Sequence, residues 1–238
     1  MLEAAFWGLV TAGSLWVGAA LAFARPSNRW VGLAMAFGSG ALIAAVAYEL
    51  VLDAYETSPD LAAAGFAVGA FAFYTGNWAI DRRRGGRVGM TTSGGQLAGS
   101  ANAIVLGTVL DGVPESFVLG ASILQDGAVP IAVVVGVFAA NVPEALSGTV
   151  GLLESGWTRT RVFGMWSIVV AVSVVAAIAG WVLLDVMPTG GGAFAASFAA
   201  GALLVMLADT LIPEAFELGG REAGLVTALG FAVGFALA

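Results

Sequence analysis

Two long apolar runs of this sequence each contain a glutamate that directly follows a proline. In the first run, Asp111 lies four residues before Glu115. In the second run, Asn141 lies three residues before Glu144. Residues three or four apart share one face of a helix, and a proline inside a helix frees the carbonyl four residues before it. The pattern therefore predicts an oxygen-rich metal site between two helices, with Asp111, Glu115, Asn141 and Glu144 as ligands.

Basic side chains that could neutralise these acids are absent from the apolar runs. All nine basic residues are arginines outside the runs, and the sequence has no histidine. An ionised carboxylate near the middle of a membrane costs about 2.5–3.5 kcal/mol on insertion scales. These acids must therefore be protonated, hydrated or bound to a cation, and we favour a cation. The alternative is that each proline–glutamate pair has only a structural role as a helix kink.

The composition is that of an integral membrane protein. Of 238 residues, 59% are hydrophobic and 11% are charged, whereas a soluble domain has about 25% charged residues. A helix needs about 20 apolar residues to cross a membrane. The runs are continuous and rich in alanine, which favours helices over strands. We predict an all-α fold with eight transmembrane helices, over residues 3–24, 30–54, 61–80, 96–124, 129–153, 162–186, 193–215 and 222–238.

The arginines orient these predicted helices. All of them fall in the first, third, fifth and seventh connections, whereas the second, fourth and sixth carry Asp60, Asp126 and Asp185. Cytoplasmic loops are enriched in basic residues. We therefore expect a multi-pass protein of the cell (inner) membrane with both termini extracytoplasmic.

The sequence also contains an internal repeat. Residues 40–56 match residues 201–217 at an offset of 161, and the pentapeptide GFAVG occurs at 65–69 and 230–234. The two proline–glutamate runs match each other at an offset of 29. We predict one transporter domain with a 3+2+3 inverted repeat: repeat A (1–80), a cytoplasmic arginine-rich loop (81–95), a central pair (96–155) and repeat B (156–238). Inverted repeats give transporters two mirror-related states; chance similarity of small-residue helices is the alternative.

Further acids lie in the second and seventh runs. They are Glu49, Asp53, Asp209, Glu214 and Glu217. Acidic entrances concentrate cations by electrostatic attraction, so we predict an accessory cation path along these residues. Solvated helix ends would explain the outer members equally well.

At these residues the sequence resembles the ZIP (Zrt/Irt-like) family of divalent-metal transporters. LDGVPES (110–116) and ANVPEAL (140–146) resemble that family's His-Asn-x-Pro-Glu-Gly motifs on helices 4 and 5. The resemblance implies that Glu115 and Glu144 are the motif glutamates. The family's histidine positions hold Asp111 and Ala140 here, and Leu42 stands where a methionine ligand sometimes occurs. LADTLIPEAFE (207–217) likewise resembles the family's seventh helix.

These departures affect which ion is expected. The resemblance implies a zinc-like substrate, whereas a ligand set made only of oxygens suits harder ions such as Mn²⁺. The predicted function is therefore transport of a divalent metal cation (Zn, Mn or Fe) by alternating access, not catalysis. A proton-coupled carrier of another solute and a non-transporting sensor or scaffold are the alternatives. The expected partners are the lipid bilayer and divalent cations, with a homodimer left open and no nucleic acid.

Overall fold

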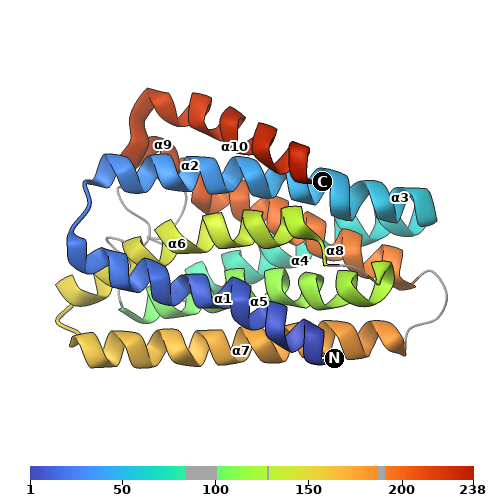
Figure 1. The fold of residues 1–238 in the computed structure, drawn as a ribbon, viewed down its shortest axis with the longest axis horizontal. Helices are drawn as coiled ribbons and strands as arrows, with labels where there is room; N and C mark the ends of the chain where they lie inside the picture. Colours follow the sequence, from blue (N-terminus) through green and yellow to red (C-terminus); the bar gives the residue numbers. More distant parts are fainter. Residues whose placement is uncertain (84–100, 128, 187–190) are drawn as a thin grey trace.

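The computed structural model describes residues 1–83, 101–127, 129–186 and 191–238 (Figure 1). Within these ranges the chain is helical and has no strand, which confirms the all-α prediction. Side chains of residues 80–83, 101–108, 110–111 and 125–126 are not described. Most of the predicted arginine-rich loop, from residue 84 to 95, and the side chain of Asp111 therefore lie outside the described part.

The helices follow the predicted runs closely. In chain order they are α1 (Leu2–Leu21), η1 (Ala22–Ala24), α2 (Asn28–Ala45), η2 (Val46–Leu52), α3 (Asp53–Thr57), α4 (Pro59–Arg83), α5 (Ala101–Asp126), α6 (Ile131–Glu154), α7 (Arg159–Asp185), α8 (Gly191–Met206), η3 (Leu207–Leu211), α9 (Ile212–Gly219), η4 (Gly220–Glu222) and α10 (Ala223–Leu237). Short 3-10 turns form η1 and η4, and η2 and η3 are π-helical.

Several helical segments could span a membrane, which identifies a multi-pass membrane protein. In the described residues, five segments are long and apolar enough by length and composition: Leu2–Ala24, Asn28–Thr57, Ile131–Glu154, Arg159–Asp185 and Gly191–Leu237. The last segment reverses direction near Gly220, which has a positive φ, and α10 then packs along α2 (Figure 1). A helix satisfies its backbone hydrogen bonds within one segment, so it suits a medium without water.

The long helices form two bundles that lie side by side. In the first, α1 packs on α6 and α7, and α5 packs on α7. In the second, α2 packs on α10 and α9, and α4 packs on α8. The π-helical segments connect these two pairs, because η2 packs on α8 and η3 packs on α2. The bundles meet where α6 lies against α2 and α5 lies against α8. The largest buried cluster lies at this junction and includes Leu42, Leu119, Val137 and Leu203.

Glycines allow the helices of the second bundle to approach each other closely. A Cβ atom at Gly69 of α4 would collide with the Phe198 carbonyl of α8, and one at Gly230 of α10 would collide with the Phe37 carbonyl of α2. Gly69 and Gly230 are 161 residues apart, as are Phe37 and Phe198. The contacts therefore relate Gly230 to Gly69. The alignment of the two GFAVG pentapeptides relates Gly230 to Gly65, one helical turn earlier on α4.

A second pair of contacts and both π-helical segments follow the same offset. A Cβ atom at Gly40 would collide with the Thr227 carbonyl, and one at Gly201 would collide with the Phe66 carbonyl. The π-helical segments begin at Val46 and Leu207, again 161 residues apart. π-helical turns within α-helices are rare and occur often at functional sites. The offset seen in the sequence therefore recurs in backbone geometry and in helix packing.

Candidate functional site

Two of the predicted metal ligands are buried glutamates on helices that contact each other. Glu115 of α5 and Glu144 of α6 each expose only 2% of their surface, and α5 packs against α6. Both helices continue through their prolines, Pro114 and Pro143. Burial of a carboxylate is costly unless it is compensated, so these glutamates are the strongest candidates for function in the described residues.

The carbonyl freed by Pro143 lies at the junction of the two bundles. It belongs to Ala139, and α2 approaches it at Gly38 so closely that a Cβ atom there would lie 2.7 Å from the oxygen. One turn earlier on α6, Gly136 lies against the backbone of Leu42. The proline-containing part of α6 is therefore in direct backbone contact with α2.

Asn141 is buried and faces α1. Its side-chain nitrogen Nδ2 lies 3.5 Å from the Thr11 carbonyl oxygen and donates a long hydrogen bond to it, and 5% of the residue is exposed. The amide oxygen remains the atom with which Asn141 could bind a cation. On the other side of the bundle, Gly112 of α5 lies near the Ser173 hydroxyl of α7.

The face of α6 that carries Glu144 is also reached from the second bundle. Ser147, three residues after Glu144, donates a hydrogen bond of 2.8 Å to Oε1 of Glu214 on α9. Both residues are buried. Residues three apart share a helix face, so this spacing is the signal by which Ser147, absent from the sequence-based ligand set, could have been found.

Glu49 has a specific backbone contact. Its Oε1 accepts a hydrogen bond of 3.2 Å from the Ala132 N–H, and its Oε2 accepts one of 3.0 Å from the Val133 N–H. Both N–H groups belong to the first turn of α6. Glu49 was predicted to lie on an accessory cation path, and the structure shows its carboxylate engaged with a helix N-terminus.

The remaining acids of the predicted accessory path lie nearer the surface. Asp53 in α3 and Asp209 in η3 are partly buried, and Glu217 in α9 is exposed. In the part of the chain that the structure describes, no three acidic side chains form a group that could hold a metal ion. The side chain of Asp111, the fourth predicted ligand, is outside that part.

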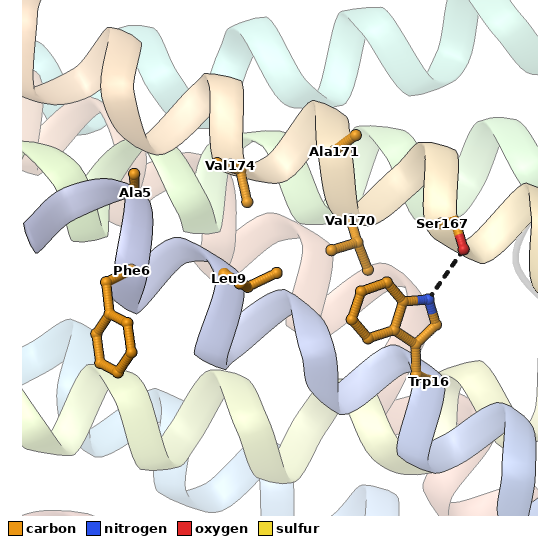
Figure 2. A pocket seen from close by; sticks show the side chains of 8 residues that line it. All are labelled: Ala5, Phe6, Leu9, Trp16, Ser167, Val170, Ala171 and Val174. Atoms are coloured by element: carbon orange, nitrogen blue, oxygen red, sulfur yellow. Dashed lines mark hydrogen bonds between the residues drawn. The ribbon is translucent and has the colours of Figure 1, made fainter. Parts of the chain in front are cut away.

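A surface groove of the described residues is unrelated to the carboxylates. It has a volume of about 490 Å³ and lies between α1 and α7, lined by Ala5, Phe6, Leu9, Trp16, Ser167, Val170, Ala171 and Val174 (Figure 2). Its polar contact is a hydrogen bond of 3.3 Å from Trp16 Nε1 to the Ser167 hydroxyl. An apolar groove of this kind has no ligand for a cation.

No protein-family model matches this chain, and no curated protein matches its sequence. The resemblance to the ZIP family therefore remains a prediction that rests on the two proline–glutamate motifs and on the helix order.

Proposed function

We propose that this protein transports divalent metal cations across a membrane by alternating access, with the cation bound by carboxylates between α5 and α6. The observation that supports the proposal best is the burial of Glu115 and Glu144 on two proline-containing helices in contact. A divalent cation supplies the positive charge that offsets the cost of burying two carboxylates. The ZIP-like motifs at the same two glutamates point to the same chemistry.

Alternating access is supported by the correspondence between the two ends of the chain. Contacts of α4 with α8 and of α10 with α2 repeat at an offset of 161, and so do the π-helical segments. We propose the eight-span inverted repeat on this basis, with the α1–α5–α6–α7 bundle moving against the α2–α4–α8–α10 bundle. Structural repeats of inverted topology give a carrier two related states of opposite access.

We also propose an orientation of the protein in the membrane, with both termini extracytoplasmic. The free ends of α1 and α10 both point toward the end of the molecule that carries α3 (Figure 1). Near that end, the Phe235 ring of α10 lies 5.0 Å from the Tyr48 ring of η2. At the opposite end lie the starts of α2 and α7 and the turn between α9 and α10 (Figure 1). Arg29 of α2 forms an ion pair with Glu222 in that turn, and Arg159 is the first residue of α7. By the bias of arginines toward the cytoplasm, the termini are extracytoplasmic.

The first test is cation-dependent stabilisation of the purified protein. Mn²⁺ and Zn²⁺ should both raise the unfolding temperature, since a ligand that binds only the folded state stabilises it. Because the ligands are oxygens, Mn²⁺ should compete well with Zn²⁺. Glu115→Gln should lower the apparent affinity at least tenfold, or about 1.4 kcal/mol.

A matched control is Glu154→Gln, which removes one carboxylate from the exposed end of α6 and should leave the apparent affinity unchanged. Equal affinity in wild type and Glu115→Gln would place the cation elsewhere. Strong Zn²⁺ binding that ignores a large excess of Mn²⁺ would contradict the oxygen-only ligand set.

A proton-coupled carrier of another solute is the second candidate. It is favoured by the observation that the described acidic side chains form no group of three that could hold a metal. Buried carboxylates serve as proton relays in many transporters. Uptake of Mn²⁺ into proteoliposomes separates the two functions, because only the first predicts cation accumulation that Glu144→Gln abolishes.

A further inference from the structure

The N-terminus of α6 has no capping side chain of its own. Pro130 occupies the N-cap position, and its ring cannot accept a hydrogen bond. The first N–H groups of a helix have no partner within the helix. Glu49 of η2 supplies both of its carboxylate oxygens to two of them, at Ala132 and Val133. Glu49, 83 positions before Ala132, thus performs the role that a serine or aspartate at residue 130 would normally perform.

This contact is stronger than an ordinary cap. A negative charge is stabilised at the positive end of a helix, and hydrogen bonds to a charged acceptor are about twice as strong as neutral ones. Glu49 is partly buried, and Ala132 and Val133 are fully buried. Burial limits the screening of this interaction by solvent and salt.

The contact also joins the two bundles. The η2 segment packs on α2, α3 and α8, whereas α6 belongs to the α1–α5–α6–α7 bundle. If the bundles move relative to each other, the bond from Glu49 to α6 must break or move with them. The position related to Glu49 by the offset of 161 is Thr210, which carries no charge. Repeat A therefore has a charged contact at this position, and repeat B cannot form the equivalent contact.

We propose that Glu49 is a latch that holds the Ile131 end of α6 against the second bundle and so stabilises one of the two access states. This inference rests on the proposed function, because a latch has a role only if the two bundles move. Glu49 is accordingly a positioning residue that controls how often α6 is released, rather than a ligand of the transported cation.

The latch is tested by cysteine labelling, for which the chain is suited because it contains no cysteine. Val133→Cys places a buried thiol on the first turn of α6 and keeps the N–H that Glu49 binds. The rate of its reaction with a thiol reagent reports local opening of this end of the helix. In the absence of any cation, Glu49→Gln should accelerate labelling about tenfold, since it removes a partly buried charge from a helix N-terminus.

Two further variants separate a latch from a simple helix cap. Glu56→Gln removes an exposed carboxylate from the neighbouring α3 and should leave the labelling rate unchanged. Pro130→Ser, added to Glu49→Gln, gives α6 a local cap for the same two N–H groups. If Glu49→Gln lowers the unfolding temperature, Pro130→Ser should raise it again. Labelling should remain fast, because the bond between η2 and α6 is still missing.

The outcomes also distinguish the latch from the proposed transport function. Equal labelling rates in wild type and Glu49→Gln overturn the latch, and so does full return to the slow rate with Pro130→Ser. Fast labelling in both Glu49→Gln proteins supports it. Cation-dependent stabilisation is measured separately, with Mn²⁺ and the wild-type protein. A wild-type protein that Mn²⁺ and Zn²⁺ do not stabilise overturns the proposed function, while the labelling comparison still decides the latch.

Discussion

At the scale of single residues, the hydrogen bond from Ser147 to Glu214 links the face of α6 that bears Glu144 to α9. Both partners are buried, and the bond measures 2.8 Å. A hydroxyl that donates to a carboxylate in such a site stabilises the fold more than the same bond at the surface, where water can replace either partner. A second buried bond, of 2.8 Å from Trp166 Nε1 to the Thr149 hydroxyl, holds α7 against α6 two residues further along α6.

We expect Ser147→Ala to lower the free energy of unfolding by about 1–3 kcal/mol, because it removes a buried donor to a carboxylate. Ser155→Ala is a suitable control. Ser155 is exposed at the end of α6, and its hydroxyl donates to the Gly151 carbonyl, so its loss should change stability by less than about 0.5 kcal/mol. Reversible unfolding in detergent measures both. Similar effects of the two substitutions would mean that the bond to Glu214 contributes little.

At the scale of helices, glycines bring the backbones of the second bundle into close contact. The α4 backbone at Gly69 lies against the Phe198 carbonyl of α8, and the α10 backbone at Gly230 lies against the Phe37 carbonyl of α2. Small residues permit such close approach of helix backbones, and they are a common basis of helix association in membranes. Equally close contacts occur in the first bundle, where a Cβ atom at Gly120 of α5 would collide with the Ala177 carbonyl of α7.

Gly69→Ala should destabilise the protein by about 1–3 kcal/mol, because a methyl group there collides with backbone that cannot move away easily. Gly76, two turns further along α4, is a matched control, since a Cβ atom at that position meets nothing within 4 Å. Gly76→Ala should be neutral or stabilise by up to about 1 kcal/mol through helix propensity. Thermal unfolding of both variants checks this expectation, and a neutral Gly69→Ala would show that α4 and α8 separate at little cost.

At the scale of the whole molecule, the distribution of arginines and the course of the helices agree. The chain passes back and forth along the long axis, and the ends of α1 and α10 point the same way (Figure 1). The starts of α2 and α7 lie at the opposite end (Figure 1). Arg29 of α2 pairs with Glu222, and Arg159, the first residue of α7, lies 4.5 Å from the Phe23 ring. Arginine side chains at helix ends anchor a membrane protein at the cytoplasmic interface.

Cysteine labelling in intact cells tests this orientation. A cysteine at Asp60, exposed at the start of α4, should react with membrane-impermeant thiol reagents. A cysteine at Arg159, exposed at the start of α7, should react only with permeant reagents. Labelling of both positions from the same side would overturn the proposed orientation and the inverted repeat together.

The sequence by itself determined the all-helical fold and the approximate extent of the helices. Helix formation in an apolar run is a local property, because each backbone N–H finds its partner four residues away within the same segment. The predicted run over 129–153, for example, corresponds to α6 at Ile131–Glu154. The burial of Glu115 and Glu144 was likewise predictable, because each carboxylate lies in an apolar run. Their role as cation ligands stays a prediction.

Only the tertiary structure decided which polar groups meet. Glu49 reaches the N–H groups of α6 and Glu214 accepts from Ser147, across separations of 83 or 84 and 67 residues. Tertiary packing also decided which glycines correspond. The helix contacts relate Gly69 to Gly230, whereas the alignment of the two pentapeptides relates Gly65 to Gly230. A pattern of residue types shows which face of a helix can be buried. The register between two helices depends on how their two surfaces fit together, and the sequence of one helix alone does not determine that fit.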